Sequence, residues 1–372
     1  MTRQGLSLRK KLGFSLAVVI ATTLLLELIS RVFVENRMVH VVEVPREDSP
    51  IRSDEKLGFV LVPGDRDGTH INRLGLRGAE VEAAKKPGCR RILMLGGSTT
   101  FGNTVTTEQA YPAVVERTLQ QSSPDKCVEV INAGIAGAHS YHHLQRYRHL
   151  YAPLKPDVVT IYVGWNDFGI YLWERDSWQP ETLAAQSLVV DVGPASLALL
   201  RNSSLARVGY SGYKSAMFRQ RLQSLASSPS VAQELARPVE SLRKNLQAVI
   251  DLARGHGATV VLIKFPFVLD DERVKEEVRE LEGMDVPGKI ESMIPMVSFE
   301  PGLPVLVAEV YDGLAKQPGV TTVDCRPPFR SRALAERWKL FDDAIHPNAE
   351  GYALLGACVA SALEGEAERS AP

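Results

Sequence analysis

The chain has 372 residues, of which 45% are hydrophobic and 23% charged. This composition supports a substantial buried core and excludes an intrinsically disordered polymer. The length fits one large domain with an insertion, or two domains. The formal net charge is −1, and no basic patch alternates with aromatic residues, so nucleic acid is not an expected partner.

The N-terminal segment is predicted to be a membrane anchor. An apolar run from Leu12 to Leu26 continues weakly to Phe33, close to the roughly 20 residues that a membrane-spanning helix needs. Basic residues precede the run, so the positive-inside rule places the N-terminus in the cytoplasm. A cleaved signal peptide is the alternative, but the following residues lack the small-residue pattern of a cleavage site. We therefore expect a single-pass protein of the inner (cytoplasmic) membrane, with residues 1–34 as stub and anchor and the remainder periplasmic or otherwise extracytoplasmic.

The rest of the chain predicts an α/β domain. Residues 35–88 are polar and rich in Pro and Gly, and we interpret them as a linker followed by an N-terminal extension. The domain itself is expected over 89–365. Apolar runs rich in β-branched residues predict five strands, at 91–95, 128–131, 157–163, 259–265 and 320–323. Such strands separated by helical segments indicate a parallel sheet covered on both faces.

The segment at about 168–230 interrupts this alternation and is expected to be an insertion. One interpretation is a cap or specificity element, and a second is a membrane-contacting element. The third is a hydrophobic face, formed by its apolar run at 187–200, that packs on the main sheet.

Four motifs at predicted strand ends or before the last helix carry side chains suited to catalysis. Ser98 follows Gly96 and Gly97 in a strand-to-turn-to-helix context, although a serine there is also an ordinary helix N-cap. A Gly-rich turn follows the second strand at 132–137, and GWND ends the third strand at 164–167. Near the C-terminus, Asp343 precedes His346 by three residues, so the carboxylate can hold Nδ1–H and leave Nε2 as a general base for serine.

Taken together, these blocks resemble the SGNH (GDSL-like) hydrolase family. The resemblance rests on GGST at 96–99, Gly137 in NAGIAG, GWND at 164–167 and DAIHP at 343–347, and it covers about residues 91–363. It implies a flavodoxin-like three-layer sandwich with a central five-stranded parallel sheet. One position departs from the family pattern, because Gly97 stands where the family usually has an acid before the nucleophile.

The resemblance also implies roles for individual residues. Ser98 would be the nucleophile, His346 the base and Asp343 its orienting acid. The oxyanion hole would consist of the backbone N–H groups of Ser98 and Gly137 and the side chain of Asn166. No cofactor and no metal are expected.

The function expected from these roles is a serine esterase that acts on acyl, above all acetyl, esters of an extracytoplasmic substrate. An acylated small molecule or a cell-surface polysaccharide would be that substrate. An O-acyltransferase uses the same triad and differs only in what attacks the acyl-enzyme. A catalytically silent envelope scaffold or binding protein is the alternative from another functional class.

Other polar groups have simpler interpretations. His139 and His143 have the i, i+4 spacing of a metal pair, but no third ligand is evident, and with His142 they suggest a polar helix face near the active-site rim. The charge run at 270–280 suggests a solvated helix face. Arg77 lies in the extension, and no argument from the sequence places it at the site.

A disulfide between Cys89 and Cys127 is expected from the strand order that the resemblance implies, 2-1-3-4-5. In that order the first two strands are neighbours, and each cysteine lies just before one of them, at the amino edge of the sheet. An oxidising compartment would permit the bridge. Cys325 and Cys358 leave other pairings open.

Overall fold

The computed structural model describes residues 7–34, 50–174, 178–181, 183, 194–281, 283–288 and 302–369. It divides into two compact units, one comprising Met1–Ser49 with Ser187–Gln220 and the other Pro50–Gln186 with Arg221–Pro372. The linker predicted directly after the anchor and the first part of the apolar run at 187–200 lie outside the described residues.

The smaller unit begins with helix α1 (Leu8–Ile29), which continues as one π-helical turn, Ser30–Val34. At 1.5 Å per residue its 22 residues extend for about 33 Å, roughly the thickness of a bilayer's hydrocarbon core. The segment Leu8–Phe33 has a mean hydropathy of 2.2, and its residues other than Ser30 are not buried. Among the described helices it alone is long and apolar enough to cross a membrane, a test that a signal sequence also passes.

Two helices of the predicted insertion belong to the same unit, α6 (Pro194–Asn202) and most of α7 (Ser204–Ala226). The carboxylate of Glu27 in α1 accepts hydrogen bonds from the backbone N–H groups of Ser204 (2.9 Å) and Leu205 (3.0 Å). It also accepts one from the hydroxyl of Ser203 (2.8 Å). The first N–H groups of a helix have no partner within it, so Glu27 caps α7. The sequence did not predict this contact between anchor and insertion.

The larger unit is built on the predicted parallel sheet, in the order β6-β5-β7-β8-β9. Its strands are β5 (Arg90–Gly96), β6 (Val128–Gly134), β7 (Val158–Tyr162), β8 (Thr259–Lys264) and β9 (Val320–Asp324). Each lies within a few residues of its predicted position. All four pairings are parallel, which confirms the predicted sheet and its order 2-1-3-4-5.

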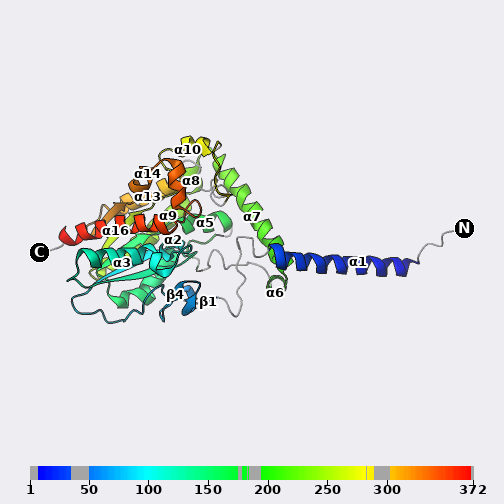
Figure 1. Cartoon of the computed structure of the whole chain (residues 1–372), viewed down its shortest axis with the longest axis horizontal. Helices are drawn as coiled ribbons and strands as arrows, with labels where there is room; N and C mark the ends of the chain where they lie inside the picture. The colour runs from blue at the N-terminus through cyan, green and yellow to red at the C-terminus, as the bar shows by residue number, and fades with distance from the viewer. Residues whose placement is uncertain are drawn as a thin grey trace. The chain divides into compact units, whose positions relative to one another are not determined.

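Helices cover the sheet in two groups (Figure 1). Helix α3 (Tyr111–Ser122) packs against β6 and against α16 (Ala349–Arg369). The second group is centred on α9 (Ala236–Gly255), which packs against β8. It also packs against other helices, among them α4 (Ser140–Arg146), α5 (Trp165–Glu174) and α13 (Leu303–Leu314). The α/β fold class is therefore confirmed. Shorter helices are α2 (Ser98–Phe101), α8 (Val231–Glu234), α10 (Val274–Leu281), α14 (Pro327–Arg330) and α15 (Leu334–Arg337).

The N-terminal extension forms two small antiparallel hairpins. Strand β1 (Ile51–Asp54) pairs with β2 (Gly58–Leu61), and β3 (Gly64–Arg66) pairs with β4 (Thr69–Ile71). Isolated antiparallel bridges join Ile71 to Arg77, and Arg77 to Asn132 in β6. The extension is thus attached to the edge strand of the main sheet.

The charge run at 270–280 is mostly solvent-exposed, as predicted, but two of its acids, Asp270 and Glu277, are buried. Glu277 in α10 is only 1% exposed and receives two hydrogen bonds from the guanidinium of Arg337, at 2.8 and 3.0 Å. Asp270 is also buried and pairs with Arg330 at 3.1 Å. The arginines that make burial of these acids tolerable come from α14 and α15, about 60 residues further along the chain, so local sequence does not reveal them.

Four cysteines form two disulfides. Cys89 is bonded to Cys127, with Cα atoms 4.5 Å apart, just before β5 and β6. Cys325, directly after β9, is bonded to Cys358 in α16, with Cα atoms 5.8 Å apart. The sequence alone did not assign the second pair.

The first disulfide is predicted to stabilise the larger unit. Replacing both partners, Cys89→Ala with Cys127→Ala, is expected to lower the free energy of unfolding by roughly 2–4 kcal/mol, because the bridge closes a loop with a sequence separation of 38. Denaturant unfolding of the full chain in detergent measures this change. An unchanged unfolding free energy, or both thiols recovered free from the native host, would contradict the prediction.

Candidate active site

The first element of the site is the turn between β5 and the short helix α2, which begins at Ser98. Gly97 precedes it, and a Cβ atom there would lie 2.7 Å from Nδ2 of Asn166. A side chain at position 97 would therefore require the amide of Asn166 to shift. The backbone of the turn therefore brings the amide of Asn166 next to Ser98.

Ser98, His346 and Asp343 form a continuous chain of hydrogen bonds. Nε2 of His346 lies 2.7 Å from Oγ of Ser98, although 248 residues separate them in sequence. Nδ1 of His346 lies 2.7 Å from Oδ2 of Asp343. The other carboxylate oxygen, Oδ1, accepts the backbone N–H groups of Ile345 (2.9 Å) and His346 (2.8 Å).

The electrostatics of this group suit a base held by an ionised acid. Burial favours the neutral form of Asp343, but the hydrogen bonds from His346 and the two backbone N–H groups outweigh it. The pKa of Asp343 therefore lies below its ordinary value. An ionised Asp343 fixes Nδ1 of His346 as the protonated nitrogen and leaves Nε2 to accept a proton from Ser98.

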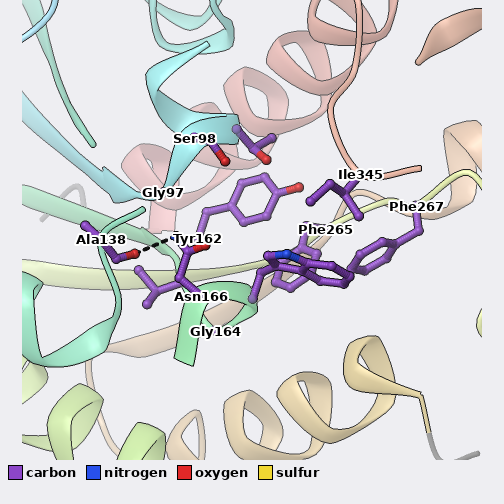
Figure 2. A pocket seen from close by; sticks show the side chains of 12 residues that line it. Gly97, Ser98, Ala138, Tyr162, Gly164, Asn166, Phe265, Phe267 and Ile345 are labelled. Atoms are coloured by element: carbon purple, nitrogen blue, oxygen red, sulfur yellow. Dashed lines mark hydrogen bonds between the residues drawn. The ribbon is translucent and has the colours of Figure 1, made fainter. Parts of the chain in front are cut away.

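Gly137 lies on the loop that follows β6, and Asn166 lies in the first turn of α5, shortly after β7. The amide of Asn166 donates to the carbonyl of Ala138 at 2.7 Å, the dashed line in Figure 2. An amide carries two N–H bonds, so this contact fixes its orientation and leaves the second for another acceptor. Gly137 has φ of +76°, a conformation that glycine adopts without strain, and it directly precedes Ala138.

A small cavity opens beside Ser98, with a volume of about 30 Å³. Figure 2 shows aromatic side chains around it, and Tyr162 stacks on Phe265 with ring centroids 4.6 Å apart. The rings of Trp165 and Phe267 have their centroids 5.5 Å apart. The cavity is lined by Gly97, Ser98, Thr99, Ala138, Tyr162, Val163, Gly164, Trp165, Asn166, Phe265, Phe267 and Ile345. Its walls come from the loops after β5, β7 and β8, with Ala138 from the loop after β6.

Arg77 supports the site from the extension without lining the cavity. Its side chain is buried and donates to the carbonyls of Phe101 (2.7 Å), Gly102 (2.5 Å) and Val105 (2.6 Å). The guanidinium also lies over the ring of Phe101 at 4.8 Å, and burial lowers the pKa of Arg77 to about 10. Arg77 thus holds the turn that ends α2, a role that sequence reasoning missed.

The three histidines do not form the predicted polar face. His139, His142 and His143 are all buried at or near the start of α4. Burial lowers the pKa of His142 to about 4 and that of His143 to about 3. Within the described residues no group of three or more His, Cys, Asp or Glu side chains is arranged to hold a metal ion.

Asp167 joins the first turn of α5, which also carries Asn166, to the start of α4, just after the loop that carries Gly137. Its buried carboxyl accepts the backbone N–H of Ser140, with both oxygens at 3.2 Å, and the hydroxyl of Ser140. Asn245 in α9 donates to the same hydroxyl at 2.9 Å. Burial outweighs these hydrogen bonds and raises the pKa of Asp167 from 3.8 to about 7.

This raised pKa predicts a pH-dependent stability. Below about pH 4 both folded and unfolded chains carry the proton on Asp167; between about pH 4 and 7 only the folded chain keeps it, so stability falls as pH rises. Relative to Asp167→Asn, the wild type is expected to lose up to about 1.4 kcal/mol per pH unit across this window. Denaturant unfolding at pH 5, 6, 7 and 8 measures the difference. The matched variant Asp125→Asn, at an exposed site, should show no such trend, and a constant difference for Asp167→Asn would contradict the assigned cause.

Comparisons with known proteins agree with this geometry. The sequence model of the GDSL-like Lipase/Acylhydrolase family matches residues 94–354. A comparison with curated proteins gives no match.

Several solved structures are similar to the chain. A protein described as a GDSL-like lipase from Parabacteroides merdae is 16% identical, with a TM-score of 0.45, over 76% of this chain and 99% of that one. An acetylxylan esterase from Geobacillus stearothermophilus is 14% identical, with a TM-score of 0.42, over 73% and 92%. A lipase/acylhydrolase from Enterococcus faecalis is 19% identical, with a TM-score of 0.41, over 74% and 96%.

The family model covers well over half of the chain, and it includes Ser98, Gly137, Asn166, Asp343 and His346. The chain therefore belongs to the GDSL-like lipase/acylhydrolase family, and it is an SGNH-type serine hydrolase that acts on ester bonds.

Proposed function

We propose that this protein is a membrane-anchored esterase that removes short acyl groups, above all acetyl, from a hydroxyl-rich extracytoplasmic substrate such as a cell-surface polysaccharide. The observation that carries the proposal is the hydrogen-bonded chain from Ser98 through His346 to Asp343 at the mouth of a cavity of only about 30 Å³. The hydrogen-bonded chain supports the reaction type, and the size of the cavity supports a short acyl group.

The proposed reaction begins when Oγ of Ser98 attacks the ester carbonyl carbon and Nε2 of His346 takes its proton. Asp343 stabilises the resulting imidazolium through Nδ1. The oxyanion accepts hydrogen bonds from the backbone N–H groups of Ser98 and Gly137 and from the amide of Asn166. The ester C–O bond then breaks, and the leaving alcohol oxygen takes the proton from His346.

Water completes the cycle by the same route. His346 removes a proton from water as the oxygen attacks the acyl carbon on Ser98, and the proton then returns to Oγ as the carboxylic acid leaves. Every proton passes through Nε2 of His346, and no cofactor is required for the balance.

The cavity favours a short acyl group. The space beside Ser98 is small, and packed aromatic rings form much of its wall, which favours a short acyl group over a long chain. Longer chains would have to displace the packed rings of Tyr162, Phe265 and Phe267, which costs energy in a close-packed wall.

The proposed location rests on α1 and on the cysteines. Arg9, Lys10 and Lys11 lie at the start of α1, so the positive-inside rule places that end in the cytoplasm and the larger unit outside. Both disulfides lie in the larger unit and suit an oxidising compartment. We therefore propose the inner membrane with the catalytic unit on its outer side.

Acyl-chain preference tests this proposal. The full chain in detergent is expected to hydrolyse p-nitrophenyl acetate with kcat/KM at least about tenfold above that for the octanoate, because forcing the longer chain into the packed aromatic wall costs about 1–3 kcal/mol. Ser98→Ala should lower the acetate rate by about a thousandfold or more. Phe267→Ala enlarges the cavity and should shift the preference toward longer chains.

Two results would contradict the proposed nucleophile or the proposed acyl site. Full acetate activity in folded Ser98→Ala would exclude Ser98 as nucleophile. Equal kcat/KM for acetate and octanoate in the wild type would exclude the small cavity as the acyl site.

A further inference from the structure

A second, larger hollow lies between the N-terminal extension and the loop after α2. We call it the extension groove; its volume is about 500 Å³, within the range of small-molecule binding sites. Its apolar floor is formed by Ile51, Leu61, Ile71, Phe101 and Val105. Neither the family motifs nor the proposed reaction uses it.

The topology places the groove and the small cavity on opposite sides of Ser98. The groove is walled by the segment after β5, including Asn103 and Thr104, and by Ala136 from the loop after β6. The small cavity is walled mainly from the ends of β7 and β8. Because the sheet order is β6-β5-β7-β8, the helix α2 that begins at Ser98 stands between the two hollows.

The groove is also tied to the catalytic loops. Thr104 donates from Oγ1 to the carbonyl of Pro347 at 3.0 Å, next to His346. Ala136 is adjacent to Gly137, and Arg77 fixes the backbone of Phe101 and Val105 in the groove wall. A ligand held in the groove is therefore held against the same segments that carry Ser98, Gly137 and His346.

The rim of the groove carries polar side chains that are available to a ligand. Arg66, Asp67, Thr69 and Asn103 line it, and their side chains form no hydrogen bond or ion pair with the described residues. An apolar floor with a cation, a carboxylate, a hydroxyl and an amide at the rim suits a sugar ring, which presents a C–H face and several hydroxyl groups. A lipid alcohol would match only the floor.

We propose that the extension groove binds the saccharide that carries the scissile ester. The acyl group then lies in the small cavity and the sugar alcohol lies across α2, so the oxygen that takes the proton from His346 departs toward the groove. This inference rests on the proposed ester hydrolysis at Ser98. It assigns the N-terminal extension to substrate recognition.

The test compares two acetates that share the acyl group and differ in the alcohol. Chemically acetylated cellotetraose offers a saccharide, and p-nitrophenyl acetate offers a small ring. Arg66→Ala in the full chain is expected to lower the ratio of kcat/KM for the saccharide to that for the aryl ester by about three- to tenfold, the loss of one or two hydrogen bonds. Thr69→Trp, which fills the groove, should lower it further.

Arg52→Ala is the matched control. Arg52 is an exposed arginine of the same extension that does not line the groove, and its replacement should leave the ratio unchanged. An equal loss on both substrates in Arg66→Ala and Thr69→Trp, or no loss on either, would overturn the proposal. A preference for dodecyl acetate that Thr69→Trp removes would assign the groove to a lipid alcohol and also overturn it.

A binding measurement separates this proposal from the proposed function. Calorimetric titration of acetylated cellotetraose into the Ser98→Ala full chain should give binding that Thr69→Trp abolishes and Arg52→Ala does not. Absence of esterase activity together with this binding pattern would overturn the reaction and keep the groove assignment. Esterase activity without groove-dependent binding would keep the proposed reaction and overturn the groove assignment.

Discussion

The structure depends on one constraint, the common direction of five neighbouring strands. Parallel strands end at the same edge of the sheet, so the segments after β5, β6 and β7 meet there even though Ser98, Gly137 and Asn166 are far apart in sequence. The loop before α16 then brings His346 within 2.7 Å of Ser98. The buried β-branched residues of the strands therefore determine where the polar groups converge.

Buried polar contacts hold the loops at that edge in place. Arg77 fixes the turn after α2, and Asp167 links the loop of Gly137 to the helix of Asn166 through Ser140. Each contact satisfies groups that would otherwise be costly to bury. The positions of Ser98, Gly137 and Asn166 thus depend on residues that do not line the cavity.

The sequence was informative where function rests on local pattern. Continuous apolar runs predict the five strands, and the three-residue spacing from Asp343 to His346 allows the hydrogen bond that the structure contains. It was uninformative where a partner lies far away in the chain. Glu277 reads as a solvated charge until Arg337 is placed beside it, and nothing local to Arg77 or Glu27 identifies the backbone groups that they contact. His139, His142 and His143 have the spacing of a polar face, but all three are buried, and the ring of His142 packs against Phe59 of the extension.

The type of reaction can be predicted from local sequence, whereas the substrate cannot. Local motifs account for the ester chemistry, whereas the small cavity and the extension groove arise from segments that only the fold brings together, such as Phe267 with Tyr162, and Ile51 with Phe101. Water and a second hydroxyl group can each resolve an acyl-enzyme formed at the same triad. The local sequence around Ser98 does not encode that choice.

The central claim is that Ser98 is a nucleophile activated by His346, and covalent labelling with a fluorophosphonate tests it most directly. Intact-mass and peptide mass spectrometry of the full chain in detergent should show one adduct, located on the peptide that contains Ser98, absent in Ser98→Ala and formed much more slowly in His346→Gln. Folded wild-type protein that stays unlabelled, or an adduct on another residue, would contradict the account and favour a silent binding protein that keeps the hydrolase fold.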